Sequence, residues 1–441
     1  MRKLLLASVA TIAGTLAMTA GAQAQPVKVP APGAVVVHLN GWFDFEGVAM
    51  SNPTTDGSKF SAINTVGLFR LYPGFDATLK NGMQFGVASE IRDTLAAPNG
   101  AGVNGNTAVA AGAAGNGTVS LYVRRAYGYV GEKSAGYVRF GQTDSAFSLM
   151  SYGDIEGFGD AQQWNSDLGT AAVLEAAGKP NNLFAVSGAL YTTSKIVYIS
   201  PSFAGVNFAV GFEPNSNGIA EGTASNLSGQ TSIAGSSNSR RRNTIDAMIG
   251  YSADMDGVGL KASVGYLDAS PLGGSPVTTP SSFTVTGATG GNLQGTFTPA
   301  STKAAPNYKN MGIVQAGAQV AVGGATVGVN YKTGSVNNGY TFLTPGQRHD
   351  NDFLVSGIYT MGPVILGASY FFNQSAGGYT VGGTVARTQS NDGVAIGANY
   401  NFSPNFGLFA QYLYGQVHQA SATSHGNSHT NALGVGASLH W

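Results

Sequence analysis

The residues with the clearest potential for chemistry are a run of acids that follows a stretch rich in Arg, Tyr and Val. Residues 143–189 contain six acids and a single base. These are Asp144, Asp154, Glu156, Asp160, Asp167 and Glu175, against Lys179. The preceding residues, 124–142, favour a β-hairpin, because two runs rich in Tyr and Val flank the turn-forming residues 131–136. The acidic, Gly-rich residues 143–169 cannot continue that hairpin. We therefore interpret the hairpin as a wall and the acidic segment as a gate that lies inside it.

Basic residues stand among the apolar residues of several predicted strands. Successive side chains of a strand point to opposite faces, so a base between apolar neighbours points away from the apolar face. This rule places the following bases, with the acid Glu90, on an inner face: Arg70, Arg92, Arg124, Arg139 and Lys261. Arg125 instead shares a face with Tyr127 and Tyr129. We expect that face to be the outer one. Guanidinium groups stay ionised side by side, and a ring of charges biases which ions pass a channel. An alternative is that these arginines only pair with Glu90 and the loop acids to hold the segment in place.

The composition limits the class of protein. The chain has 441 residues, of which 10% are charged, with 22 Lys+Arg against 22 Asp+Glu and no Cys. A soluble protein would carry charge on roughly a quarter of its residues, so part of this surface faces something other than water. The formal net charge of zero and the lack of a basic, aromatic-lined patch argue against nucleic-acid binding. The missing Cys excludes disulfide scaffolds and thiolate metal sites.

The N-terminus has the order of a signal peptide. Arg2 and Lys3 precede the apolar residues 4–22, and Ala22-Gln23-Ala24 offers small residues where a signal peptidase reads. We predict a signal peptide over residues 1–24, with cleavage after Ala24. An uncleaved membrane anchor is the alternative. No later apolar run is long enough for a spanning helix, which leaves an exported all-β protein or an outer-membrane barrel.

Alternation of apolar and polar residues predicts the strands. In residues 35–47, Val35, Val37 and Leu39 alternate with His38 and Asn40, which is the period of a strand with two different environments. The same rhythm recurs along the chain. The sixteen predicted strands are 35–47, 60–72, 82–93, 118–130, 136–142, 190–200, 205–213, 241–253, 258–268, 308–322, 325–334, 351–361, 364–373, 392–402, 406–418 and 431–441.

The connections between these strands alternate without exception between tight turns and long loops. The eight long intervals are 48–59, 94–117, 143–189, 214–240, 269–307, 335–350, 374–391 and 419–430. A soluble sandwich has no reason to place every long loop at one end. An outer-membrane barrel does, with long extracellular loops and short periplasmic turns. The sequence thus predicts an all-β fold, a sixteen-stranded antiparallel transmembrane β-barrel over residues 35–441, after a Pro-rich lead-in at 25–34. Sixteen strands enclose a space too wide for side chains to fill, so it holds water.

Aromatic residues gather near the ends of the predicted strands, as at 370–372 and 400–406. They fit girdles at the two membrane interfaces, although aromatic residues favour any strand. The last strand, 431–441, ends in Trp441 and carries Leu433, Val435 and Leu439 on one apolar face.

Four strings, in order, resemble the general trimeric porins of Gram-negative outer membranes. They are LFRLYPGFDATLKNGMQFGVASEIR (68–92), YVRRAYGYV (122–130), AGYVRFGQTDSAF (135–147) and SKIVYISPSFAGVNFAVGF (194–212). They cover about the first half of the chain. The second half matches only in its alternation of strands and connections. The resemblance implies a homotrimer and a third loop that folds into the barrel. It also implies that acids of that loop face the basic wall across a constriction. Asp154, Glu156, Asp160 and Asp167 are the loop acids that we assign to it.

Two further clusters have several interpretations. The basic residues 240–242 lie beside the fourth loop. They can be interpreted as a solvated rim, as a group that steers anions, or as a site for lipopolysaccharide phosphates. His418, His425 and His429 lie in or beside the predicted eighth loop, where a metal site is an alternative to plain polar loop residues. Nucleophile-elbow and zinc-protease motifs are missing from the sequence, so we predict no enzyme, and no cofactor or metal.

Together these observations predict an outer-membrane porin, a water-filled channel for passive diffusion of ions and small hydrophilic solutes. Its constriction would lie between residues 143–189 and the basic wall. The expected partners are outer-membrane lipid, lipopolysaccharide, small solutes and further copies of the chain, and no nucleic acid. A substrate-selective channel for a sugar or an anion is an alternative of the same fold. A structural or adhesive barrel is another, but it has no need of an inward acidic loop opposite a basic wall.

Overall fold

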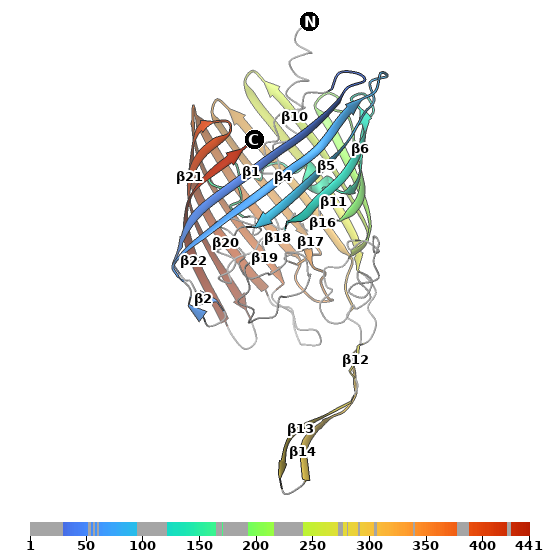
Figure 1. Ribbon diagram of the computed structural model, residues 1–441, viewed down its shortest axis with the longest axis vertical. Coiled ribbons are helices and arrows are strands. Elements are labelled where there is room, and N and C mark those ends of the chain that lie inside the picture. Colours follow the sequence, from blue (N-terminus) through green and yellow to red (C-terminus); the bar gives the residue numbers. More distant parts are fainter. Residues whose placement is uncertain are drawn as a thin grey trace.

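Sixteen strands of the chain close into one barrel in which each strand pairs with its neighbours in the antiparallel sense (Figure 1). The computed structural model describes residues 30–51, 54–55, 58–59, 61–94, 121–164, 170, 193–215, 241–271, 277–279, 281–289, 292–303, 307–337, 340–376, 388–420 and 425–441. The predicted sixteen-stranded barrel is confirmed, and every predicted strand overlaps an observed one. The predicted signal peptide, 1–24, lies outside the described residues.

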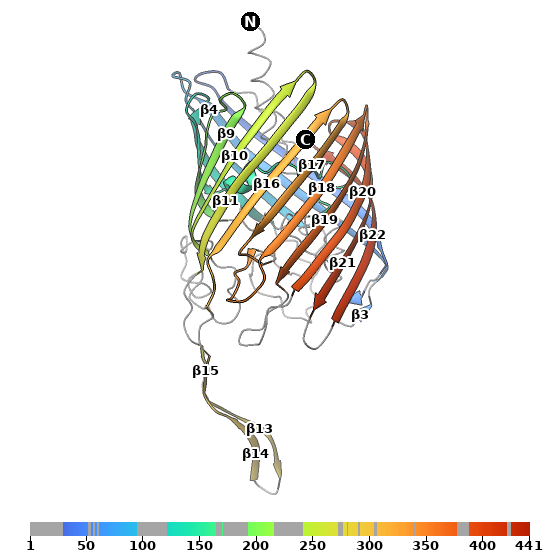
Figure 2. The same cartoon turned by 180° about the vertical axis from the view of Figure 1, so that it is seen from behind.

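The barrel strands follow one another around the wall in chain order. They are β1 (Val35–Met50), β4 (Ile63–Thr78), β5 (Gln84–Thr94), β6 (Tyr122–Glu132), β7 (Gly136–Gln142), β8 (Ser194–Ile199), β9 (Val206–Asn215), β10 (Arg241–Met255), β11 (Val258–Pro271), β16 (Met311–Val322), β17 (Ala325–Gly334), β18 (Asp350–Met361), β19 (Val364–Ala376), β20 (Thr388–Ser403), β21 (Phe406–Ala420) and β22 (His425–His440). Figure 2 shows the wall from β9 to β22 from behind.

The first and last strands close the barrel. β1 pairs with β22 from Trp42 opposite His440 to Met50 opposite Ala432. Beyond this ladder, the backbones of Gly41 and Trp441 exchange two hydrogen bonds, of 3.0 and 3.1 Å. A Cβ atom on Gly41 would lie 1.9 Å from the Trp441 ring, so glycine is needed for this approach. Trp441 thus extends the pairing between the first and last strands of the barrel by one residue.

Tight turns gather at one end of the barrel and long connections at the other (Figure 1). At the short-turn end, Asp256 and Gly257 join β10 to β11 with positive φ at both residues, the geometry of a two-residue hairpin turn. The predicted alternation is wrong at the eighth long loop. β21 runs to Ala420 and β22 starts at His425, so the strands extend through most of 419–430.

The long connection between β11 and β16 carries a β-ribbon of its own. β12 (Val277–Thr279) pairs with β15 (Ser301–Lys303), and β13 (Ser282–Thr289) pairs with β14 (Asn292–Thr298). The ribbon projects away from the long-loop end of the barrel (Figure 1). A smaller pair, β2 (Thr54–Thr55) with β3 (Ser58–Lys59), follows β1. Both segments had been predicted as plain loops.

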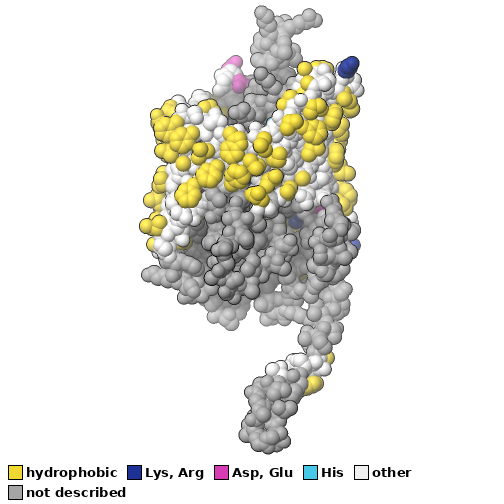
Figure 3. Space-filling model, viewed as in Figure 1, with side chains coloured by type: hydrophobic (Ala, Val, Ile, Leu, Met, Phe, Trp, Pro, Cys, Tyr) yellow, Lys and Arg dark blue, Asp and Glu magenta, His cyan; other side chains and the backbone are white. Residues whose placement is uncertain are grey.

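The two faces of the wall differ in polarity. On β17, Val327 and Val329 point outward and are 56% and 42% exposed, whereas Asn330 and Lys332 point inward and are 0% and 1% exposed. Figure 3 shows hydrophobic side chains gathered over the outer surface of the strands. An apolar outer face and a polar inner face are the reverse of a soluble protein and typical of a barrel in lipid.

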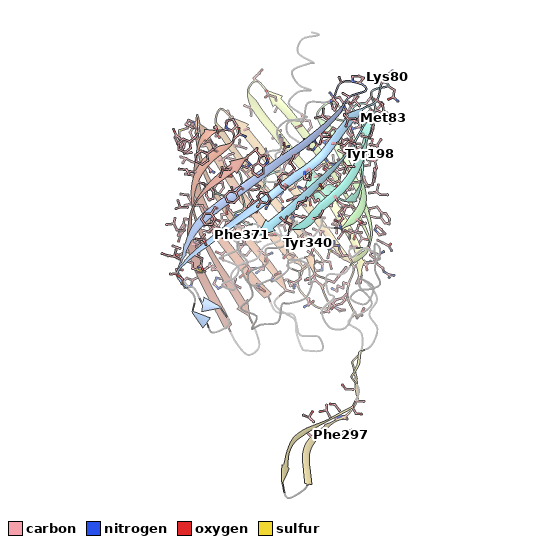
Figure 4. The ribbon with its side chains drawn as sticks, in the orientation of Figure 1. Lys80, Met83, Tyr198, Phe297, Tyr340 and Phe371 are labelled. Atoms are coloured by element: carbon pink, nitrogen blue, oxygen red, sulfur yellow. The ribbon has the colours of Figure 1, made fainter. Side chains whose placement is uncertain are left out.

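The interior also holds apolar clusters, because part of residues 143–170 lies against the inner wall. α2 (Ala146–Leu149) contributes Phe147 to one cluster with wall residues of β8 to β16, while Phe158 and Trp164 join another that includes Phe371. Figure 4 labels Phe371 and Tyr340, which lie within the barrel, and Lys80 and Met83, which lie at the short-turn end. Within the described ranges, no helix is long and apolar enough to cross a bilayer.

Candidate functional site

The loop that follows β7 is fastened to the inner wall from its start. Ser145 caps α2 by accepting a hydrogen bond from the Ser148 backbone N–H at 3.3 Å. Asp246 on β10 accepts a second one from the Phe147 backbone N–H at 2.9 Å. Phe147 and Met150 are 2% and 1% exposed, and they pack against the wall. This helical turn therefore directs the chain along the inside of β9 to β11.

Backbone N–H groups attach the middle of the loop to hydroxyl and amide side chains of the wall. Ile155 donates to Ser356 of β18 at 2.9 Å, and Gly159 donates to Asn399 of β20 at 2.7 Å. Glycine on the wall makes the close approach possible. A Cβ atom at Gly317 of β16 would lie 1.8 Å from the Tyr152 carbonyl oxygen. The wall is thus shaped to accept the loop.

The far part of the described loop reaches the first strands. The Trp164 indole N–H donates to Ser369 Oγ at 2.9 Å, and Arg70 Nη2 donates to Gln162 Oε1 at 2.9 Å. The Thr170 hydroxyl donates to Glu46 Oε2 of β1 at 2.7 Å. The loop therefore follows the wall from β9 through β16 to β22 and meets β1 and β4.

On the wall of β4 to β6, Glu90 of β5 lies at the centre of four arginines, here called the arginine cluster: Arg70, Arg92, Arg124 and Arg125. Its Oε2 accepts hydrogen bonds from Arg124 Nη1 at 3.0 Å and Arg125 Nε at 2.7 Å. Its Oε1 accepts one from Arg92 Nε and lies 3.9 Å from Arg70 Nε. Glu90 is 1% exposed. Four guanidinium groups around one carboxylate leave this part of the wall with excess positive charge.

Sequence parity assigned Arg125 to the wrong face, because the face that it shares with Tyr127 and Tyr129 is the inner one. Arg124 reaches the same face through a bulge. The ladder between β5 and β6 shifts register, so that Glu90 lies opposite Arg125 while Ile91 lies opposite Val123. This β-bulge leaves Arg124 as the extra residue, and a bulge re-aims the side chains around it. Arg124 and Arg125 therefore both reach Glu90. Arg125 also contacts Asp144, at 2.6 Å between Nη1 and Oδ2.

Two further bases face the interior beside tyrosine rings. Arg139 of β7 lies over the Tyr127 ring at 5.0 Å, and Lys261 of β11 lies over the Tyr152 ring at 5.6 Å. No ion pair joins Arg139 or Lys261 to a carboxylate within the described part of the chain. Their charge is accordingly less neutralised by the protein than that of the arginine cluster.

The described loop acids fall into two groups. Asp144 belongs with the arginines. Burial raises the pKa of its carboxyl, but the charges of Arg125, Arg139 and Arg124 together outweigh burial and lower that pKa. Asp154 and Glu156 flank Ile155, which is fixed to β18, and β18 is eight positions from β6 in the closed order of sixteen strands. These two acids thus lie on the side of the barrel opposite the arginine cluster.

Burial changes the ionisation of the acids on that far side. It raises the pKa of Asp154, and with the neighbouring Asp154 charge it raises the pKa of Glu156 to about 8. Burial also raises the pKa of Asp160 to about 6, against the effect of hydrogen bonds from its neighbours. Asp160 is 3% exposed and accepts backbone hydrogen bonds from Gln162 and Thr170. Asp160 therefore holds the shape of the loop, and Glu156 is the loop acid whose charge changes between neutral and mildly alkaline pH.

An ion network on β8 to β10 escaped the sequence analysis. Glu213 Oε1 lies 3.3 Å from Arg241 Nη2, and Glu213 Oε2 lies 3.7 Å from Lys195 Nζ. Lys195 also donates to the Thr143 carbonyl oxygen at 2.9 Å, at the root of the loop. The expected role of residues 240–242 as a rim is wrong for Arg241, which is 3% exposed. The alternation of side chains could have indicated this network. Lys195 precedes Ile196 and Glu213 follows Phe212, so each charged residue points away from an apolar neighbour.

The remaining predicted residues are placed as follows. Asp167, Glu175 and Lys179 lie outside the described residues, as does Arg240. His418 lies in β21, and His425 and His429 lie in β22, so these histidines belong to strands rather than to a loop. Over the described ranges, no group of three or more His, Asp or Glu side chains is arranged to hold a metal ion.

Comparisons with known proteins agree with this architecture. A family model described as Gram-negative porin matches residues 8–420. The chain is similar to the structure of OmpT of Vibrio cholerae, an outer membrane protein in its trimer form, with 14% identity, 92% of this chain and 100% of that chain covered, and a TM-score of 0.50. It is also similar to an anion-selective porin from Comamonas acidovorans, with 14% identity, the same coverages and a TM-score of 0.49. At such identities, likeness to solved structures shows the fold alone. No curated protein matches the chain.

Proposed function

The chain belongs to the Gram-negative porin family, and from this premise we propose a water-filled channel for passive diffusion of ions and small hydrophilic solutes. The protein is an outer-membrane porin, and its family and fold indicate a channel rather than an enzyme. A closed barrel of sixteen strands is too wide for its side chains to fill. In this membrane the short turns would face the periplasm and the long loops the outside.

The observation that carries the proposal is the arrangement of charge across the lumen. The arginine cluster and Arg139 lie on β4 to β7, while Asp154 and Glu156 lie on the loop beside β18. These acids would oppose the positive charge with a field across the lumen that grows as the pH rises, because burial raises the pKa of Asp154 and raises that of Glu156 to about 8. Fixed charges that line a pore bias which ions pass. A structural or adhesive barrel does not require this arrangement.

Purified protein in a planar lipid bilayer tests the channel directly. We expect discrete current steps in a salt solution, and a reversal potential under a salt gradient that reports a weak preference for anions. Liposomes that contain the protein should swell in small sugars but not in large ones. A membrane that stays electrically silent with correctly folded protein would contradict the proposed function.

The ion preference should depend on pH through the loop acid on the far side. Because its pKa is raised to about 8, Glu156 is neutral at acidic pH and gains a negative charge as the pH rises through that value. From about pH 6 to about pH 9 the anion preference should therefore fall, by roughly twofold in the permeability ratio. Reversal potentials measured across this range check the expectation. Glu156→Gln should remove most of the change, and an unaltered pH response in that variant would exclude Glu156 as the titrating group.

We also propose that the chain forms a trimer with β7 and β8 at the interface. These strands have 7 and 6 residues, whereas a strand needs about 9–11 residues to cross the hydrocarbon of a bilayer. These two strands are therefore too short to span the hydrocarbon layer, so we expect another copy of the chain to cover them. The Vibrio cholerae OmpT structure, described as a trimer form, is a relative in fold.

Substitutions on the outer face of these short strands test the interface. Phe140 and Ile196 are paired neighbours that are 48% and 57% exposed. Replacing both with Ser should convert trimers to monomers in mild detergent, as measured by light scattering during gel filtration. The matched control replaces Leu366 and Ile396, outward residues on the opposite wall, and should keep the trimer. Equal behaviour of the two double variants would place the interface elsewhere.

The other partners follow from the surface. The outer apolar band would contact membrane lipid, and Arg242, exposed at the long-loop end of β10, is the candidate to bind lipopolysaccharide phosphates. Export would use the N-terminal segment, with cleavage after Ala24.

A further inference from the structure

Three tyrosines form a strip on the inner wall between the arginine cluster and the short-turn end. Tyr127 and Tyr129 are alternate residues of β6, and Tyr137 of β7 lies opposite Gly131 at the end of the same ladder. All three side chains are half-buried. The Tyr129 and Tyr137 rings are 6.4 Å apart, with their planes at 63°. By contrast, Phe371 of the wall and Phe158 of the loop are both 0% exposed.

Glycines on the neighbouring strands let these rings lie against the wall. A Cβ atom at Gly86 of β5 would lie 2.7 Å from Tyr129 Cε1, and one at Gly131 would lie 2.8 Å from Tyr137 Cδ1. Each ring therefore lies close to a glycine backbone. Because these side chains are half-buried on the inner wall, part of each ring stays open to the lumen, where a flat molecule can pack against it.

A cation stands beside the strip. Arg139 is directly opposite Tyr129 in the β6–β7 register, and its guanidinium lies over Tyr127. Residues opposite each other in an antiparallel ladder have Cα atoms about 4.5–5.5 Å apart. The nearest carboxylates are already engaged. Asp144 pairs with Arg125, while Asp76 accepts the Tyr129 hydroxyl.

Two of the three hydroxyl groups of the strip are engaged as well. Tyr137 donates to Gln84 Oε1 at 2.6 Å, and Tyr129 donates to Asp76. A sugar would need several polar partners around its ring, and these groups are not available to it. What the strip offers is ring faces and one guanidinium, which suit a flat apolar body that carries a single anionic group.

We propose that the wall of β5 to β7 binds small aromatic carboxylates on the periplasmic side of the constriction. The carboxylate would be held by Arg139, with the aromatic ring packed against Tyr129 and Tyr137, parallel to one ring and edge-on to the other. Asp76, which accepts the Tyr129 hydroxyl, repels the anionic group and keeps the carboxylate on the Arg139 side of that ring. The inference rests on the proposed function, since it names a class of solute for the same channel.

Current block in a planar bilayer tests the proposal with three probes of the same charge. Benzoate, added on the short-turn side, should reduce the single-channel current with a saturable concentration dependence. Cyclohexanecarboxylate has a similar size but no aromatic face and should bind about fivefold more weakly, while acetate should not block measurably. Benzamide, which lacks the charge, should also fail to block.

Variants assign the block to the strip. Tyr129→Leu and Tyr137→Leu should each weaken benzoate block about fivefold with little change in open-channel conductance, and Arg139→Gln should abolish it. The matched control is Tyr266→Leu, because Tyr266 faces outward and is 52% exposed. Tyr129→Phe and Tyr137→Phe keep the rings and should keep the block, which covers the case in which a Leu variant fails to fold.

The outcomes separate this inference from the proposed function. A protein that conducts but is blocked equally by benzoate and cyclohexanecarboxylate overturns the aromatic site and leaves the channel intact. The same holds if the tyrosine variants bind benzoate as the unmodified protein does. A folded protein that conducts no ions overturns the proposed function itself.

Discussion

Replacing Arg124, Arg125 and Arg139 together with Gln should turn the channel toward cations. These side chains carry the positive charge that faces Asp154 and Glu156 across the lumen. Removing them leaves Glu90 with Arg92 and Arg70 only. An altered barrier of about 1 kcal/mol, the energy of two charges at about 4 Å in water, corresponds to roughly a fivefold change in the cation-to-anion permeability ratio. The reversal potential under a salt gradient measures this ratio.

A control with the same change in net charge separates the constriction from the rim. Lys80, Lys133 and Arg242 are exposed at the two ends of the barrel, and Figure 4 labels Lys80 at the short-turn end. Their joint replacement with Gln should shift the reversal potential far less, because solvent and salt screen exposed charges. If the two triple variants shift it equally, selectivity depends on total charge and not on the wall of β6 and β7.

The barrel strands were predictable because their two faces meet different surroundings. Lipid outside and water inside impose a period of two, as in β17, and this period located sixteen strands. Where a strand extends beyond the membrane, water meets both faces and the period is lost. This explains why residues 419–430 were mistaken for a loop, and why the polar ribbon β12 to β15 was missed.

Prediction of the site from the sequence depended on an unbroken register. Parity placed Arg70, Glu90 and Arg92 on the inner face, and the structure has their side chains in contact. It did not foresee that Arg124 and Arg125 both reach Glu90, because the bulge at Arg124 is invisible in a single sequence. It placed Arg125 on the outer face because Tyr127 and Tyr129, which share the face of Arg125, were treated as apolar residues of that outer face. An aqueous lumen accepts tyrosine, whose hydroxyl and ring suit a wet wall.

The path of the loop was not predictable at the level of residues, because it depends on matching between distant segments. Wall glycines such as Gly317 make room for the backbone at Tyr152, and Asp246 receives the Phe147 N–H. Each partner is ordinary by itself in the sequence. Only the closed barrel brings them together, and the same contacts place Asp154 and Glu156 on the far side from the arginine cluster.

Glu90→Gln should be among the most destabilising single substitutions in the barrel. Its carboxylate accepts hydrogen bonds from Arg92, Arg124 and Arg125 and is 1% exposed. Removing one partner of a buried ion pair costs about 3–5 kcal/mol, because the charges that remain are left uncompensated. We expect a lower unfolding midpoint in urea for the detergent-solubilised protein. The same variant should favour anions more strongly, since the wall gains one positive charge.

A second substitution should distinguish charge balance from lost packing. In Glu90→Gln with Arg124→Gln, the uncompensated guanidinium is removed, so part of the lost stability should return even though two native side chains are missing. Asp256→Asn, an exposed carboxylate in the β10–β11 turn, is the control and should leave the midpoint nearly unchanged. The alternative outcome is that the double variant is destabilised by the sum of the two single effects. Glu90 would then stabilise the barrel through local packing and not by neutralising the surrounding arginines.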